Sequence, residues 1–252
     1  MHEACFVIIS HRHKFIFIKT RKTAGTSIEA ALAPLCGPND VITSDGTKKQ
    51  IGFYSEYAKN FEGSFNLLRE IRQQDSLLGI ARSVRDYIER PRYYNHIAGL
   101  AVMSRTDRSV WENYYKFCFE RNPWDKMVSF YHFYNRRKAE RDQLNEYIQN
   151  KPLLKTVDQH FATDWSRYTR KNQVIVDRVY DFSDIAGGVE HALRYCGVPE
   201  VLISQIDLPR LKSDTRKDNI RLSPRSVEVI AQVFRNEIKY MNYVVPSHLI
   251  DA

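Results

Sequence analysis

The sequence predicts an α/β protein with three layers, in which helices cover both faces of a mainly parallel central sheet. Two stretches carry this prediction: Phe15–Leu32 and Tyr114–Tyr134 each begin with a buried-type strand, continue through a polar turn and end in an amphipathic segment. Further along, Val174–Asp177 is expected to be a strand that continues to Tyr180–Phe182, and Ser183–Tyr195 is expected to be a helix. Strands that alternate with helices pair in parallel, because a tight hairpin cannot join them.

The size and composition of the chain predict one globular domain over residues 1–252. Hydrophobic residues make up 43% of the chain and aromatic residues 12%, which excludes a disordered protein. The formal net charge of +8 suits an anionic cofactor or substrate, although the 38 basic residues are interleaved with 30 acidic ones. No nucleic-acid recognition motif accompanies this charge, so we expect no nucleic-acid partner.

We expect a soluble, cytoplasmic protein with reduced thiols. The longest apolar run near the N-terminus, Ala4–Ile9, is too short for a membrane span or the core of a signal peptide. The four cysteines are far apart, and no Cys or His spacing resembles a metal site, so no metal is expected. The sequence leaves the oligomeric state open.

The first polar turn has the residues of an anion site. After the apolar run Phe15–Lys19, the helix is expected to begin at Thr26 with a capping box, in which Glu29 stands three residues after the cap. The free N–H groups of a first helical turn, together with the helix dipole, attract negative charge. Gly25 would let the backbone approach an oxyanion, and Lys22 would add a mobile positive charge.

The second strand and helix place an arginine at the same edge of the sheet. Lys116–Glu120 is expected to be a buried strand, and Arg121 follows its carboxyl end. Asn122 suits a cap and Pro123 the first helical position. Ser129 is expected on the helix face opposite the core stripe. Ligands of open α/β sheets bind at the carboxyl ends of the strands, so the two turns are expected to converge there.

The two turns resemble the cofactor motifs of one enzyme family. KTAGTS, residues 22–27, resembles the 5′-phosphosulfate loop of sulfotransferases that use 3′-phosphoadenosine 5′-phosphosulfate (PAPS), with Arg21 in place of the usual proline. RNPWDKMVSFY, residues 121–131, resembles the 3′-phosphate motif of the same family. The likeness is to the bacterial and carbohydrate-type members, and it implies a P-loop-like fold. A Walker A loop is excluded, because Lys22 precedes Gly25 instead of following a glycine.

The resemblance also implies roles for individual residues. Lys22 would contact the oxygen that bridges sulfate and phosphate, and His96 would take a proton from the acceptor, with His160 as the second candidate for that base. A basic loop near residues 212–218 is expected to reach the 3′-phosphate. The implied cofactor-binding residues are Arg21, Lys22, Thr23, Ala24, Gly25, Thr26, Ser27, Arg121, Ser129, Arg216 and Lys217.

The expected reaction is an in-line sulfuryl transfer from PAPS to a hydroxyl or amine of an acceptor, a saccharide or another small molecule. Residues 43–95 and 136–172 are expected to be insertions that bind this acceptor, whose identity the sequence does not specify. One alternative stays open. Apolar residues followed by Asp177 imitate a Walker B strand, as in a P-loop kinase or NTPase that depends on ATP and Mg²⁺.

Overall fold

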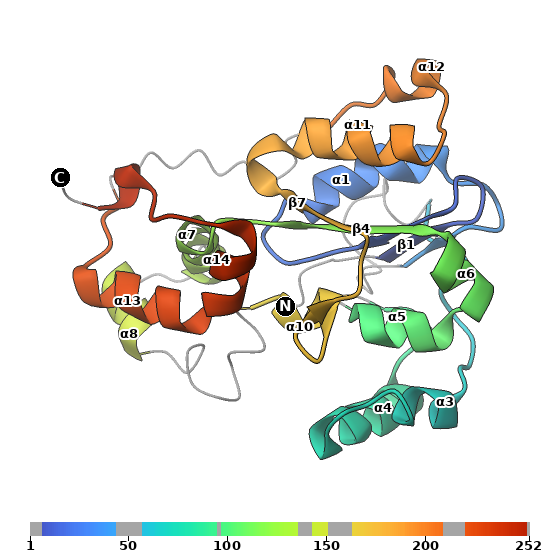
Figure 1. The fold of residues 1–252 in the computed structure, drawn as a ribbon, viewed down its shortest axis with the longest axis horizontal. Helices are drawn as coiled ribbons and strands as arrows, with labels where there is room; N and C mark the ends of the chain where they lie inside the picture. Colours follow the sequence, from blue (N-terminus) through green and yellow to red (C-terminus); the bar gives the residue numbers. More distant parts are fainter. Residues whose placement is uncertain are drawn as a thin grey trace.

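A five-stranded sheet forms the centre of the protein, with the strand order β3-β1-β2-β4-β7 (Figure 1). The structure is a computed structural model that describes residues 7–43, 57–94, 97–135, 143–150, 163–208 and 220–250. The strands of the sheet are β1 (Val7–Ser10), β2 (Phe15–Ile18), β3 (Val41–Ile42), β4 (Tyr115–Glu120) and β7 (Arg178–Asp181).

Strand direction confirms a mainly parallel α/β sheet. β2 pairs in parallel with β4, and β4 pairs in parallel with β7. β1 is antiparallel to both of its neighbours, β2 and β3, so β3 points the same way as β2. Four of the five strands in this sheet therefore have their carboxyl ends at one edge. The relation to P-loop folds stays a prediction.

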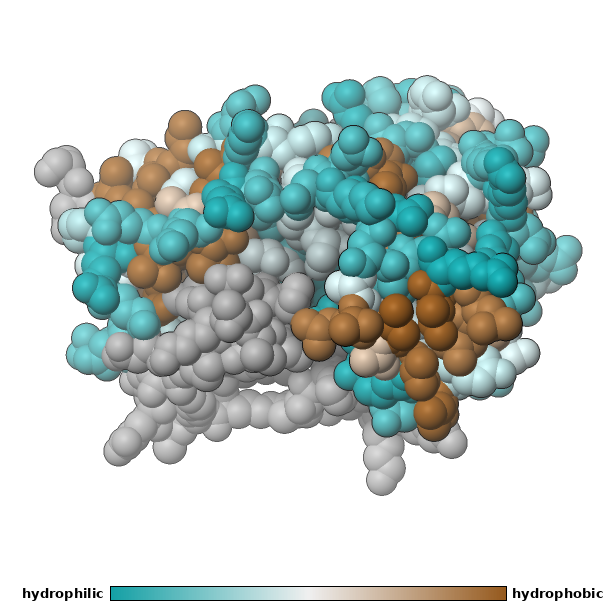
Figure 2. Space-filling view, turned by 60° about the horizontal axis from the view of Figure 1, so that its bottom comes forward, coloured by the Kyte–Doolittle hydropathy of each residue, from teal (hydrophilic) through white to brown (hydrophobic). Residues whose placement is uncertain are grey.

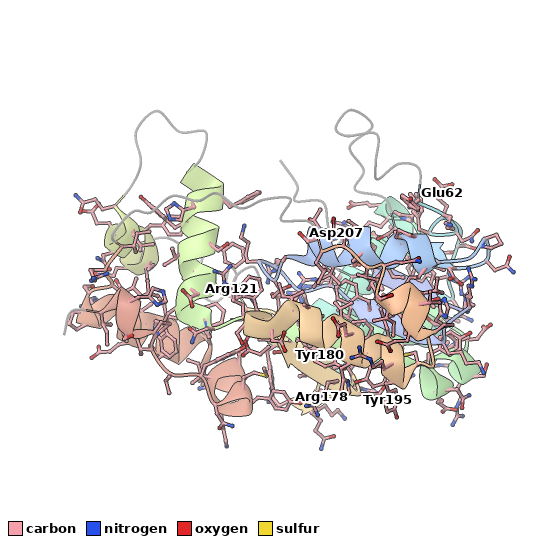
Figure 3. All side chains as sticks on the ribbon, turned by 90° about the horizontal axis from the view of Figure 1, so that it is seen from above. Glu62, Arg121, Arg178, Tyr180, Tyr195 and Asp207 are labelled. Atoms are coloured by element: carbon pink, nitrogen blue, oxygen red, sulfur yellow. The ribbon has the colours of Figure 1, made fainter. Side chains whose placement is uncertain are left out.

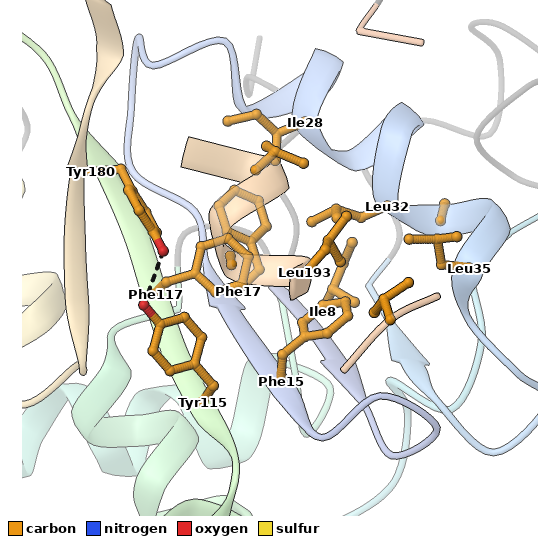
Figure 4. Close-up of a cluster of buried hydrophobic side chains, with 14 of the residues drawn as sticks. Ile8, Phe15, Phe17, Ile28, Leu32, Leu35, Tyr115, Phe117, Tyr180 and Leu193 are labelled. Carbon is orange, nitrogen blue, oxygen red and sulfur yellow. Dashed lines mark hydrogen bonds between the residues drawn. The ribbon is translucent and has the colours of Figure 1, made fainter. Parts of the chain in front are cut away.

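Alternating side chains of β2 pack against helices on the two faces of the sheet. Phe15 and Phe17 belong to a cluster with α1 (Gly25–Leu32) and α11 (Ile185–Tyr195), which Figure 4 shows. Ile16 and Ile18 point to the other face, where α5 (Gly99–Arg105) covers them. Each fully buried aromatic or aliphatic side chain of this kind stabilises the fold by about 1.5–3 kcal/mol. The strands thus position both turns rigidly.

A third apolar cluster lies beyond the carboxyl edge of the sheet and is built from helices. It joins α7 (Pro123–Asn135) and α8 (Leu144–Asn150) to α13 (Pro224–Val233), with Trp124, Met127 and Ile230 buried at its centre. The last helical segment of the chain therefore packs on other helices. It is divided in two, because Phe234 leaves the helical backbone before α14 (Arg235–Met241) begins.

The strand predicted from Val174 to Phe182 is found only in part. Val174 ends β6 (Gln173–Val174), which pairs with β5 (Thr169–Arg170) outside the main sheet, and the central strand begins only at Arg178. The remaining elements connect and cover the sheet: η1 (Ala33–Leu35), α3 (Leu67–Ile71), α4 (Leu77–Glu89), α6 (Arg108–Asn113), α10 (Trp165–Tyr168), η3 (Phe182–Asp184), α12 (Glu200–Ile203) and η4 (Ser247–Leu249).

Among the described residues, Cys36, Cys118 and Cys196 are free thiols, as expected, while Cys5 lies outside them. None of the helices described has the length and apolar character needed to span a bilayer.

Candidate active site

The loop between β2 and α1 holds two non-glycine residues in the left-handed backbone region. Lys22 has a φ of 61° and Ala24 a φ of 52°. Side chains disfavour this conformation, which persists where surrounding contacts fix it and which is common at ligand-binding sites. The surrounding contacts therefore hold this loop in a conformation that glycine adopts more easily than lysine or alanine.

Helix α1 begins without the predicted capping box. Its N-cap is Ala24, which has no side-chain cap, and the first helical residue is Gly25. Glu29 does not reach back toward Thr26; its Oε2 accepts a hydrogen bond from Lys19 Nζ at 2.7 Å, and both side chains are buried. A buried carboxylate is stabilised far more by a cation than by one backbone N–H group, so the ion pair replaces the box.

Gly25 leaves the space that the Lys19 side chain occupies. A Cβ atom added at Gly25 would lie 2.1 Å from Lys19 Cε, far inside van der Waals contact. The glycine is therefore required for the buried pair of Lys19 and Glu29. Its predicted second role, a close approach of the backbone to an anion, stays a prediction.

Backbone donors are open at the start of α1. The N–H groups of Ser27 and Ile28 donate to the carbonyl of Ala24, at 2.8 and 3.1 Å. Within the described ranges, the N–H groups of Thr23, Ala24 and Gly25 donate to no protein acceptor. Such amides, at the positive end of a helix dipole, are well suited to an oxyanion.

Lys22 reaches from this loop to α7. Its Nζ lies 4.4 Å from the centroid of the Phe133 ring and 5.8 Å from that of Phe130. An ammonium over an aromatic face is stabilised by the negative charge of the ring face. The two rings therefore hold the charge of Lys22 between the loop and the helix that follows β4.

Arg121, at the end of β4, carries a buried nitrogen without a partner. Within the described residues, the N–H of Nε donates to no acceptor, and no carboxylate forms an ion pair with the guanidinium. The guanidinium lies over the Phe182 ring, 4.3 Å from its centroid, and burial lowers the pKa of Arg121. An anion would supply the missing acceptor, because a guanidinium fork matches phosphate and sulfate.

Hydrogen bonds connect the two loops, although nearly a hundred residues separate them in sequence. Nη1 of Arg121 donates to the carbonyl oxygen of Lys22 at 3.4 Å. Thr20 Oγ1 donates to the carbonyl of Phe119 and lies 2.9 Å from Oγ1 of Thr23. The labelled Arg121 in Figure 3 stands beside α7, at the edge where the parallel strands end. The structure therefore brings Lys22 and Arg121 together.

A buried ionic cluster supports both loops from below. Lys126 is fully buried; its Nζ lies 2.6 Å from Glu120 Oε1 and 2.7 Å from Asp164 Oδ2. Tyr168 donates to the other oxygen of Glu120 at 3.0 Å, and the N–H of Arg121 donates to Oε1 at 2.9 Å. Two buried carboxylates need a shared cation, and this need draws Lys126 inward.

Arg21 belongs to this cluster. Its N–H donates to Asp164 Oδ2 at 2.8 Å, and its Nε donates to Oδ1 at 2.9 Å. Burial alone would raise the pKa of Asp164, but the positive charges of Arg21, Lys126 and Arg167 hold it well below its usual value. A proline, which the resembled loops have at this position, could not donate the backbone bond. Arg21 thus supports the loop, and its predicted contact with the cofactor stays a prediction.

Glu237 is a buried carboxyl near the same cluster. Its Oε1 accepts the N–H of Trp165 at 3.2 Å, and both residues line a hollow of about 320 Å³ with Thr163 and Asn236. Burial, followed by the nearby charge of Glu120, raises the pKa of Glu237 to about 7. This carboxyl therefore gains or loses its proton near neutral pH.

Asp177 lies at the wrong edge of the sheet for a Walker B role. Its Oδ2 accepts the backbone N–H of Lys116 at 2.7 Å and lies 2.9 Å from Lys116 Nζ. Lys116 is near the start of β4, whereas the loop of Lys22 lies at the strand's opposite end. The interpretation of this strand as Walker B is therefore wrong, and the kinase alternative loses the feature that suggested it.

The remaining predicted site residues fall into two groups. Ser129 is partly buried on α7, the helix that also carries Phe130 and Phe133. Four lie outside the described residues: His96, His160, Arg216 and Lys217.

Sequence reasoning missed the carboxylates beneath the loops. Glu120 is the last residue of a buried strand, and Lys126 stands one turn into the following helix, so a charged pair could have been inferred from this spacing. Asp164 comes from a distant polar segment, and its sequence carries no comparable signal.

Comparison with known proteins bears on the identity of the chain. The sequence pattern described as "Sulfotransferase family" matches residues 6–244, nearly the whole chain. An uncharacterized protein of Archaeoglobus fulgidus is 28% identical over 109 residues, which are 42% of this chain and 87% of that protein. No solved structure matches the chain. The family match spans both loops and the cluster beneath them, and the chain belongs to the sulfotransferase family.

Proposed function

We propose that this protein transfers a sulfuryl group from PAPS to a hydroxyl or amine of a small-molecule acceptor, with a saccharide as the first candidate. Family membership supports sulfuryl transfer in general. The observation that carries the choice of donor is the contact of Arg121 Nη1 with the carbonyl of Lys22, which brings two anion-type loops to one edge of the sheet. PAPS carries one phosphate at the 3′ position of its ribose and another at the 5′ position. Two adjoining anion-binding loops are suited to hold these two phosphates.

The side chains and amides present fit this donor. The open N–H groups of Thr23, Ala24 and Gly25 would hold the 5′-phosphate, together with the hydroxyls of Thr26 and Ser27. The unpartnered Nε of Arg121 would bind the 3′-phosphate, and Ser129 on α7 would add a hydroxyl. Arg216 and Lys217 remain candidates for the same phosphate.

PAPS would supply the sulfuryl group and a phosphate leaving group that gains negative charge as the bond to sulfur breaks. Lys22 would donate to the bridging oxygen, where this charge develops. The loop's fixed left-handed residues would keep that donor in place without reorganisation. The chain's own part is thus to align the reactants and to stabilise charge.

The acceptor side of the site would consist of a general base and the segments that contact the acceptor. His96 would accept the proton of the attacking hydroxyl, with His160 as the second candidate. The insertions at 43–95 and 136–172 would supply acceptor contacts. A saccharide hydroxyl, a phenol or an amine would each be compatible with this arrangement.

Ligand-dependent thermal stability tests the proposed donor. We expect 3′-phosphoadenosine 5′-phosphate (PAP) to raise the melting temperature in the presence of a metal chelator. A ligand present at 100 times its dissociation constant stabilises the folded protein by about 2.7 kcal/mol. A kinase or NTPase would instead be stabilised by ATP with Mg²⁺ and would show no preference for the 3′-phosphate. That result would contradict the proposal, and transfer of radioactive sulfate from labelled PAPS to a panel of saccharides would complete the test.

A further inference from the structure

Helix α4 has its polar side turned inward and its apolar side turned outward. Ser83 and Asp86 are 2% and 5% exposed, and Asp86 accepts a hydrogen bond from Tyr94. By contrast, Leu77 is 85% exposed and Ile88 is 75% exposed. A helix on the surface of a soluble domain normally buries its apolar stripe, so this orientation requires an explanation.

The outward side chains form one continuous apolar face. Positions 77, 81, 84 and 88 recur every three or four residues, which aligns them along the helix. Figure 2 shows apolar side chains gathered where α3 and α4 come forward. We name this surface the α4 face, and its members are Leu68, Leu77, Leu78, Ala81, Val84 and Ile88.

Arginines border the α4 face. Arg72, at the end of α3, and Arg82, on α4, are exposed, and among the described residues neither has a carboxylate within ion-pair distance. Arg85 and Arg90 lie 3.2 and 3.5 Å from the single carboxylate of Asp86. Glu89 is the exposed acidic residue of α4. The border is therefore positively charged overall.

We propose that the α4 face docks the protein on an anionic lipid surface, with the leucines and isoleucine entering the interface and the arginines meeting lipid phosphates. A helix with an apolar stripe and basic neighbours is suited to lie in the plane of a bilayer surface. The proposal concerns a surface remote from the PAPS site, so it holds whether or not the proposed donor is correct.

Shape and charge favour lipid over a second copy of the chain. α3 and α4 lie at the periphery of the molecule, as a ridge below the sheet and α5 (Figure 1). A bilayer accommodates a ridge, whereas a protein partner needs a matching groove. In a symmetric dimer built on this face, Arg82 of each copy would share one interface with its counterpart, and like charges would oppose the pairing.

Vesicle co-sedimentation of the full chain tests the proposal. We expect binding to vesicles of phosphatidylcholine mixed with phosphatidylserine, and much weaker binding to phosphatidylcholine alone. The double variant Leu77→Ser/Ile88→Ser should bind at least about tenfold more weakly, because two exposed apolar side chains no longer enter the interface. Arg72→Glu/Arg82→Glu should weaken binding to the mixed vesicles by about tenfold or more, in a salt-dependent way.

The control is Val201→Ser/Val244→Ser, which removes exposed apolar side chains elsewhere; Val244 is 75% exposed, as is Ile88. This variant should bind vesicles like the unchanged protein. Thermal melting should be equal in all variants, which shows that each is folded. Failure of the unchanged protein to bind mixed vesicles, or full binding by Leu77→Ser/Ile88→Ser, would overturn the proposal. A dimer of the unchanged protein in light scattering, which becomes a monomer in Leu77→Ser/Ile88→Ser, would also overturn the proposal.

Discussion

The position of the Lys22 ammonium matters, and the rings of Phe133 and Phe130 hold it between the loop and α7. A donor held in place for the charge that develops during transfer affects turnover more than binding. Lys22→Ala should therefore lower the conversion of PAPS to PAP by about 10²–10³-fold with a panel of acceptors present, while PAP affinity changes far less.

Lys14→Ala is the matched control for this variant. Lys14 is an exposed lysine whose φ is also positive, at 54°. It lies in the turn before the first residue of β2, whereas the loop of Lys22 follows the last residue of β2. It should leave turnover unchanged. Equal losses of affinity and turnover in Lys22→Ala would contradict the role given to this side chain.

Glu237 gives the folded state a dependence on pH. The pKa of its carboxyl is raised from 4.5 to about 7 in the folded protein, first of all by burial. Its contribution to stability is therefore fully present below about pH 4.5 and is lost as the pH rises through about 7, because the ionised carboxylate is poorly solvated.

Glu237→Gln should remove this dependence. We expect the variant to melt above the unchanged protein at about pH 8, with the difference shrinking toward about pH 5. For a chain of this size each kcal/mol corresponds to roughly 2–4 °C. Glu228→Gln, an exposed substitution on α13, should show no such trend. A difference in melting temperature that does not change with pH would be incompatible with the raised pKa.

At the scale of elements, apolar periodicity predicted the strands and helices that carry the site. The strands Phe15–Ile18 and Tyr115–Glu120 are found within one residue of their predicted bounds. Capping and register were less predictable. Glu29 suited a capping box by its spacing alone, but a buried lysine ten residues earlier competes for the same carboxylate.

The strand predicted from Val174 to Phe182 shows a different limit. Val174 belongs to a small hairpin, and Val176 packs in the cluster that contains Ile16 and Ile18. The central strand starts at Arg178, a residue that is not apolar. Local pattern alone does not distinguish these two arrangements, because pairing with β4 selects the register.

The junction of β2, the loop and α1 makes a prediction of its own. Gly25→Ala would place a methyl group in the path of the Lys19 side chain. Displacing Lys19 weakens its buried ion pair with Glu29, so we expect a loss of about 1–3 kcal/mol of stability and weaker PAP binding. Thermal melting and PAP titration measure the two effects.

Gly37→Ala provides the control, because a Cβ there would lie 3.7 Å from Arg12, at ordinary contact distance. It should change stability much less than Gly25→Ala. If both variants melt alike, the close approach of Lys19 to Gly25 does not determine the shape of the loop.

At the scale of the whole molecule, the two motifs predicted that one edge of the sheet would hold the site, since both follow parallel strands. The ionic cluster beneath that edge was beyond sequence reasoning. Asp164 comes from a segment with no distinguishing pattern, and only the assembled fold brings it to Arg21 and Lys126. The inverted orientation of α4 was equally hidden, because a helix of this composition is expected to bury its apolar stripe.

The central claim is that Arg121 and the loop of Lys22 hold the two ends of one nucleotide. Calorimetric titration of PAP and of AMP, which lacks the 3′-phosphate, tests it most directly in the unchanged protein and in Arg121→Ala. We predict that Arg121→Ala weakens PAP binding by about 2–3 kcal/mol, leaves AMP binding nearly unchanged, and so removes most of the preference between them. Arg108→Ala, on the exposed side of α6, should keep that preference. An Arg121→Ala protein that still prefers PAP over AMP to the full extent would contradict the claim.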